Sequence, residues 1–166
     1  MNNILLSPHF CLDEFTKSST AIKHGIQNNP PQEAVENLRR LCANTLEPLR
    51  EELGLPVVIT SGFRTKALND LLAHSSERSQ HMQGQAADFY VTPGQSGLSR
   101  RELLIKAFRL IITSEQIDYD QLILYPSFIH VSYVSRERNR RTILLGMRNG
   151  KLGYGKCSVQ NALKIQ

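Results

Sequence analysis

The sequence of 166 residues contains no tryptophan and only three cysteines, Cys11, Cys42 and Cys157. These cysteines are far apart and form no CxxC pair, which argues against a disulfide framework and against a cysteine zinc site. No apolar run approaches the roughly 20 residues that span a bilayer. The opening residues, MNNILLSPHF, have no basic region and too short an apolar stretch for a secretory signal. We therefore expect a chain that is cytoplasmic when synthesised and has no transmembrane segment.

What the chain does contain suits one domain over residues 1–166. The hydrophobic fraction of 40% and the charged fraction of 21% are typical of globular proteins. The formal net charge is +5, and residues 135–166 hold much of the excess, in Arg136, Arg138, Arg140, Arg141, Arg148 and Lys151. Such a basic stretch can face nucleic acid or an anionic wall polymer. Because no nucleic-acid-binding motif accompanies the charge, we expect no nucleic-acid partner, and residues 135–166 have no assigned role.

Hydrophobic spacing predicts helices early in the chain and strands mostly later. After an irregular, partly helical lead-in over residues 1–30, apolar residues recur at helical spacing from Val35 to Leu53, and Gly54 ends the run. Pro48 lies inside this run and predicts a kink. The other expected elements are a strand at 55–60, a helix at 65–73, a strand at 85–91, a helix from Ser99 with Glu102 in a capping box, and strands at 121–125, 128–134 and 142–147. This order predicts an α+β fold with a largely antiparallel sheet.

The segment SQHMQGQAAD, from Ser79 to Asp88, places a histidine in a polar loop and a carboxylate on a strand. Burying an ionised carboxylate among alanines is costly unless it is paired or binds a metal. A second strand, FIHVSY, carries His130 on the face opposite its apolar side chains. With His81, these residues offer two imidazoles and one carboxylate, a ligand set for catalytic zinc that leaves a fourth position for water. A lone histidine on a strand is more often a hydrogen-bonded structural residue, so spacing alone leaves both interpretations open.

The pattern S-x-H-x-x-G-x-A-x-D, with a later histidine among apolar residues, resembles the signature of the zinc D-alanyl-D-alanine carboxypeptidases. It also resembles that of their L-alanyl-D-glutamate endopeptidase relatives, which share the M15-type, hedgehog/DD-peptidase fold. Upstream, TSGFRT at residues 60–65 resembles the S-G-[YF]-R segment of these enzymes, and the resemblance runs from about Leu6 to Tyr133. It implies a small, largely antiparallel sheet with helices packed on it.

The resemblance also implies roles for particular residues. It implies one zinc ion per chain with three ligands, His81, Asp88 and His130. Arg64 would donate hydrogen bonds to the substrate carbonyl as it becomes an oxyanion, and Ser79 and Ser132 would contact the substrate. The implied reaction is metal-assisted hydrolysis of an amide bond in the peptidoglycan stem peptide, of the D,D-carboxypeptidase or the L-Ala-D-Glu endopeptidase type. A small basic domain of this kind suits a phage or prophage lysin that a partner releases to the cell wall.

The sequence departs from the family pattern at the general base. Relatives carry a carboxylate three residues before the last histidine or two residues after it, and here these positions hold Ser127 and Ser132. Asp120 is the first substitute that we expect, because it opens the strand that should pair beside His130. Further candidates are Asp118, Glu77 and His74. Because this carboxylate is missing, an alternative function stays open. In that alternative the chain is a catalytically weak or inactive relative that binds cell-wall peptide or has a structural role.

Overall fold

A computed structural model of the protein describes residues 4–72, 75–148 and 151–165. Within these ranges the strands form a two-stranded sheet and a six-stranded sheet in the order β3-β4-β6-β5-β7-β8. The strands are β1 (Leu5–Ser7), β2 (Phe10–Cys11), β3 (Val57–Ser61), β4 (Ala86–Val91), β5 (Gln121–Leu124), β6 (Ile129–Ser132), β7 (Thr142–Arg148) and β8 (Lys151–Lys156). All neighbouring strands of the larger sheet run antiparallel except β5 and β7. The α+β fold is confirmed, whereas β8 and the parallel pair were not predicted.

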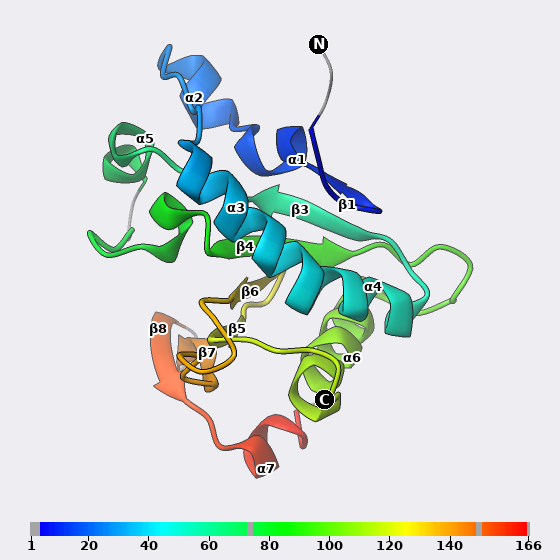
Figure 1. The fold of residues 1–166 in the computed structure, drawn as a ribbon. Coiled ribbons are helices and arrows are strands. Elements are labelled where there is room, and N and C mark those ends of the chain that lie inside the picture. Colours follow the sequence, from blue (N-terminus) through cyan, green and yellow to red (C-terminus); the bar gives the residue numbers. More distant parts are fainter. Residues whose placement is uncertain (1–3, 73–74, 149–150, 166) are drawn as a thin grey trace.

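Helices pack along the larger sheet, and most of them precede its central strands in the chain (Figure 1). They are α1 (Leu12–Thr16), α2 (Ser19–Lys23), α3 (Gln32–Leu41), η1 (Cys42–Leu46), α4 (Glu47–Leu53), α5 (Lys66–Leu71), η2 (Gln80–Gln83), α6 (Arg100–Thr113) and α7 (Val159–Ala162). The capping box predicted at the start of α6 is present, since Ser99 and Glu102 hydrogen-bond each other's backbone N–H. In the described ranges, none of these helices combines the length and the apolar character that a membrane span requires.

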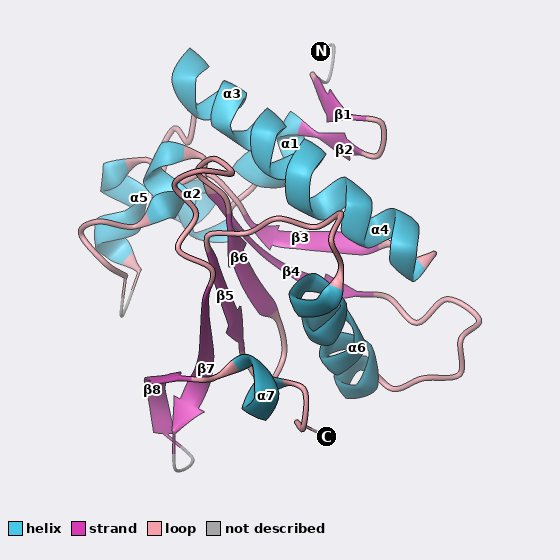
Figure 2. Ribbon diagram, turned by 60° about the horizontal axis from the view of Figure 1, so that its bottom comes forward, coloured by secondary structure: helices cyan, strands magenta, loops and turns pink. Residues whose placement is uncertain are grey.

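The predicted helix between Val35 and Leu53 is one rod in three pieces, α3, η1 and α4 (Figure 2). The middle piece, η1, is a π-helical turn that ends just before α4, and Pro48 stands in the first turn of α4. Proline cannot donate to the α-helical ladder, and the wide π turn breaks the ladder where that donor would be needed. Gly54 then ends α4 with a φ of 63°, as helix-ending glycines often do.

One face of the six-stranded sheet is apolar and packs against the helices. Helix α6 contacts both β4 and β5, and α4 contacts α6. The buried strand residues on this side are Val57, Ala87, Phe89, Val91, Leu122, Leu124, Ile129, Val131 and Ile143. Because successive side chains of a strand alternate between the two faces, Asp88 and His130 stand on the opposite face.

A single row of cross-strand neighbours runs over that opposite face. Asp88 pairs with Ser61 on one side and with His130 on the other. His130 pairs in turn with Ile123, and Ile123 with Leu144. Because directly opposed residues of neighbouring strands share a face, five strands bring one residue each to this row. The row places side chains from distant parts of the sequence next to one another.

Gly84 ends the turn that carries His81 and lies close to helix α3. It follows η2 with a φ of +68°, in the left-handed region that glycine adopts readily. A Cβ at this position would lie 2.3 Å from the carbonyl oxygen of Ala34 in α3. Backbone conformation and the close approach of α3 therefore both require glycine here.

We expect Gly84→Ala to destabilise the protein more than Gly25→Ala does. Both glycines have positive φ, which costs a residue with a Cβ roughly 1–2 kcal/mol. An added Cβ at Gly25 meets no atom within 4 Å, whereas at Gly84 it forces α3 or the turn to move. Urea unfolding of the two variants measures the difference as a lower midpoint for Gly84→Ala. Equal midpoints would show that the contact with Ala34 does not constrain the turn.

Candidate metal centre

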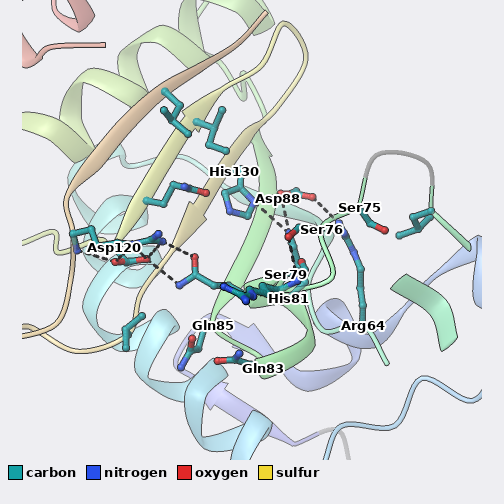
Figure 3. A pocket seen from close by; sticks show the side chains of 18 of the residues that line it. Arg64, Ser75, Ser76, Ser79, His81, Gln83, Gln85, Asp88, Asp120 and His130 are labelled. Atoms are coloured by element: carbon teal, nitrogen blue, oxygen red, sulfur yellow. Dashed lines mark hydrogen bonds and ion pairs between the residues drawn. The ribbon is translucent and has the colours of Figure 1, made fainter. Parts of the chain in front are cut away.

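His81, Asp88 and His130 bring three potential ligand atoms together at the edge of a cavity (Figure 3). Asp88 on β4 and His130 on β6 are cross-strand neighbours, and His81 reaches them from η2. The Nδ1 atom of His130 lies 2.7 Å from Oδ1 of Asp88. The Nε2 atom of His81 lies 3.3 Å from Nδ1 of His130 and 3.4 Å from the same Asp88 oxygen. The side chains are only 4–13% exposed.

The spacing of these three atoms fits zinc. Ligands bound at 2.0–2.1 Å around a tetrahedral zinc ion stand roughly 3.3 Å from one another, close to the separations of 2.7–3.4 Å found here. Two imidazoles and one carboxylate are ligand types that catalytic zinc sites use, with the fourth position left for water or substrate. The residues present therefore fit a zinc ion in both chemistry and distance.

His81 is held in the orientation and protonation state that a metal ligand needs. Its Nδ1 atom lies 2.7 Å from the carbonyl oxygen of Gly62. Because a carbonyl oxygen only accepts, Nδ1 carries the proton, and the lone pair of Nε2 faces Asp88 and His130. Burial lowers the pKa of His81 despite the nearby Asp88 carboxylate, which favours the neutral imidazole that binds metals. The Arg64 N–H also donates to the His81 carbonyl oxygen at 3.2 Å, so the S-G-F-R segment positions this ligand.

Asp88 is an ionised carboxylate with both oxygens engaged. Burial alone would raise its pKa, but the neighbouring His81 and His130 outweigh this effect and hold the pKa of Asp88 well below its usual range. Oδ1 faces the two histidines, while Oδ2 accepts a hydrogen bond from Nη2 of Arg64 at 3.1 Å. Arg64 in turn donates through Nε and Nη2 to Oγ of Ser61, at 3.0 and 2.8 Å. The guanidinium is thus fixed beside the three candidate ligands.

The cavity next to these residues has a volume of about 980 Å³, at the upper end of the range for ligand pockets. Its floor includes the cross-strand row of Asp88, His130, Ile123 and Leu144. The lining also contains two aromatic residues, Tyr125 and Phe128, whose rings are stacked with their centroids 4.3 Å apart. The remaining lining is largely polar or charged and includes Arg64, Arg78, Ser79, Gln80, Asp120, Arg138 and Arg140. The cavity thus offers both apolar and charged surfaces beside the candidate ligands.

The two serines predicted to contact substrate lie in different surroundings. Ser79 lines the cavity at the start of η2. Ser132 is completely buried. Its hydroxyl accepts a hydrogen bond from the Gln121 N–H at 3.1 Å and lies 3.5 Å from Oδ2 of Asp120. A substrate does not reach such a hydroxyl, so the prediction for Ser132 is replaced by a structural role between β5 and β6.

Among the candidate bases that the structure describes, Asp120 is the one that lines the cavity. Figure 3 shows it on the opposite side of the cavity from Arg64. Asp118 is buried and bound to Arg141 at 3.0 Å, and Glu77 is exposed outside the cavity lining. His74 lies outside the described residues.

Asp120 is tightly held in its place. Nε of Arg140 donates to its two oxygens at 3.0 and 3.1 Å, and Nε2 of Gln80 donates to Oδ2 at 2.9 Å. Burial would raise the pKa of Asp120, but these donors outweigh burial and lower it. A carboxylate with a lowered pKa and occupied acceptor positions is a weak proton acceptor. The geometry therefore gives Asp120 a strong anchoring role, and its catalytic role stays a prediction.

Comparison with known proteins agrees with the geometry. The family model described as Peptidase M15 matches residues 8–132, which is most of the chain. The matched range contains Arg64, His81, Asp88 and His130 and ends before the basic residues that follow β6. No curated protein matches the chain.

We expect Asp120→Asn to lower the free energy of unfolding at pH 7 by roughly 1–3 kcal/mol, the worth of hydrogen bonds to a charged group. The folded-state pKa of Asp120 is lowered, so its contribution is present above the unfolded value of about 4 and is lost as the pH falls through the folded value. Urea unfolding should therefore show a gap between wild type and variant that narrows below about pH 4.

The matched control is Asp70→Asn, because Asp70 forms an ion pair with Lys66 that is largely exposed to solvent. Exposed pairs of this kind contribute about 0–1 kcal/mol. An Asp120→Asn variant as stable as this control would contradict the anchoring role. If such a stable variant also lost turnover by about 100- to 10,000-fold, the range for a placed acid–base group, Asp120 would act as the general base and would have no anchoring role.

Proposed function

The chain belongs to the peptidase M15 family, and we propose that it is a zinc-dependent peptidase that hydrolyses an amide bond in the peptidoglycan stem peptide. The observation that carries this proposal is the set of three ligand atoms, separated by 2.7–3.4 Å, beside a fixed guanidinium at a cavity large enough for a peptide segment. Both the D,D-carboxypeptidase and the L-Ala-D-Glu endopeptidase reactions are compatible with this arrangement.

In this proposal Nε2 of His81, Oδ1 of Asp88 and Nδ1 of His130 would hold one zinc ion per chain. When bound, zinc would lower the pKa of a water ligand to about 7 and polarise a carbonyl group. The protein keeps the ligands in place through the Gly62 carbonyl oxygen, which orients His81, and through Arg64, which holds the second oxygen of Asp88.

Arg64 is proposed to stabilise the oxyanion that develops on the scissile carbonyl. It lines the cavity, and Ser61 and Asp88 fix its guanidinium plane. Burial lowers the pKa of Arg64, but a guanidinium remains charged at physiological pH. A donor that is already oriented stabilises developing charge without a cost of reorganisation. Ser79, on the same rim, is proposed to hydrogen-bond the substrate.

The proton acceptor is the catalytic group that the cavity supplies least well. Within the described residues, Asp88 and Asp120 are the carboxylates that line the cavity, and Asp88 is assigned to the metal. Asp120 is therefore proposed as the acceptor, and its contacts with Arg140 predict slow turnover. The same observation favours the alternative function, a relative that binds cell-wall peptide and cleaves it weakly or not at all. Ser127, the family position of the base, is exposed in the turn before β6.

We expect the zinc-loaded protein to release a new amine from soluble muropeptides, and mass spectrometry of the products identifies the bond that is cut. Arg64→Lys should lower kcat by about 100-fold or more, as loss of an oxyanion donor does, with unchanged zinc content. The reason is that one ammonium group cannot reproduce the guanidinium fork. The control Arg101→Lys changes an exposed arginine of α6 in the same way. If the zinc-loaded wild type binds muropeptides and releases no amine, the non-catalytic alternative replaces the proposal.

A further inference from the structure

A second cavity, with a volume of about 560 Å³, adjoins the cavity that contains the candidate metal ligands. Arg64 and Leu72 line both cavities, so the guanidinium proposed to stabilise the oxyanion stands between them. The second cavity lies where α2, the end of β3 and α5 meet (Figure 2). Its volume falls within the range for ligand pockets. The other described residues that line it are Lys17, Ser18, Ser19, Thr20, Ile22, Thr60, Ser61 and Leu68.

A buried side chain, Asn28, fixes the α2 wall of the second cavity relative to Arg64. The Nδ2 atom of Asn28 donates to the carbonyl oxygens of Thr16 and Phe63, both at 2.9 Å. Its Oδ1 atom accepts from the Thr65 N–H at 2.9 Å. Phe63 and Thr65 flank Arg64 in the chain, and Thr16 ends α1 shortly before α2 begins. These hydrogen bonds hold the wall in one position, and a pre-organised wall reduces the cost of ordering a binding site.

The hydroxyl groups of the second cavity can both donate and accept hydrogen bonds. Oγ of Ser61 accepts two bonds from Arg64, and Oγ of Ser18 accepts one from a backbone N–H of α2. The protons of these two hydroxyl groups are therefore left to donate to a ligand. Oγ1 of Thr60 donates to a backbone carbonyl oxygen at 3.1 Å, which leaves its lone pairs to accept. A ligand that pairs with this lining must itself carry both donors and acceptors.

The remaining lining suits a neutral ligand with an apolar face. Arg64 and Lys17 are the charged residues among the described lining, which contains no carboxylate. Leu68, which is 1% exposed, contributes aliphatic surface together with Leu72 and Ile22. A purely apolar ligand would leave the hydroxyl groups without partners, which is costly in a closed site. A sugar ring meets both demands, because its hydroxyl groups donate and accept and its C–H groups form an apolar face.

Arg64 also has donors to spare for a ligand. Within the described residues its side chain donates through Nε and Nη2, to Ser61 and Asp88. The two N–H groups of Nη1 are left for a substrate carbonyl. Because Arg64 lines both cavities, a substrate whose carbonyl is held there can extend into each of them.

We propose that the second cavity binds a sugar ring of the glycan strand to which the stem peptide is attached. This inference rests on the proposed function and narrows its substrate class to glycan-linked stem peptides. The stem peptide is joined to the glycan at its amino end, so a sugar held beside Arg64 places the scissile amide close to that end.

The test fills the second cavity with a larger side chain. Ser19→Trp and Thr20→Trp introduce an indole at two positions of α2 that line this cavity. Lys23→Trp is the matched control, because it adds an indole at an exposed position of the same helix that does not line the cavity. Calorimetry measures how tightly the zinc-loaded protein binds a disaccharide-linked stem peptide and the same peptide without the sugars. Mass spectrometry of the same samples identifies any bond that is cut.

Wild type and Lys23→Trp should bind the disaccharide-linked peptide about 10-fold more tightly than the free peptide, the worth of one or two net hydrogen bonds. Ser19→Trp and Thr20→Trp should remove this difference. Both should keep the wild-type affinity for the free peptide, which also shows that the filled variants are folded. Any cleavage should fall near the amino end of the stem peptide.

The proposal is overturned if wild type binds the two peptides equally well, if both filled variants keep the preference, or if Lys23→Trp loses it too. If the filled variants weaken binding of both peptides equally, the second cavity holds stem peptide rather than sugar. Cleavage at the D-Ala-D-Ala end would also contradict a sugar held beside Arg64. The binding measurements decide the sugar site even if no peptide is cleaved, whereas absence of cleavage counts against the proposed function alone.

Discussion

The pairing of Asp88 with His130 across β4 and β6 is the contact on which the rest of the site depends. The two residues are directly opposed in the sheet, with Oδ1 and Nδ1 2.7 Å apart. A slip of one residue in this register would turn one of them into the apolar face. That face is filled by buried residues such as Phe89 and Ile129, so packing of the core holds the register. Core packing thereby places the two side chains that the proposed metal requires.

His81 adds a different constraint, because it comes from a turn rather than from the sheet. The Gly62 carbonyl oxygen orients its ring, and Gly84 lets α3 approach the turn closely. Arg64 then links the turn to the sheet, through its backbone N–H to His81 and its side chain to Asp88. Three segments that are separate in the sequence are thus locked together by short contacts, which is the kind of rigid support that catalytic groups need.

Local pattern predicted much of the fold and the central part of the site. The alternation around Asp88 and around His130 indicated that each stands opposite the apolar side chains of its own strand. The proline in the long helical run indicated the break at η1, and the family motif supplied Arg64 and His81. Periodicity shows which face a side chain occupies, but it does not show which strands become neighbours. For that reason the parallel pairing of β5 with β7 and the burial of Ser132 were not predicted. The hydrogen bonds from Arg140 to Asp120 were not predicted either, because they join segments that are distant in the sequence.

The most direct test of the metal centre is a crystal structure of the protein grown with zinc, with anomalous diffraction data collected at the zinc absorption edge. We expect one peak per chain, bonded to Nε2 of His81, Oδ1 of Asp88 and Nδ1 of His130 at about 2.0–2.2 Å. The peak should disappear in an Asp88→Ala crystal grown under the same conditions. No peak between these three atoms in the wild type, or a zinc ion bound to other residues instead, would contradict the metal centre.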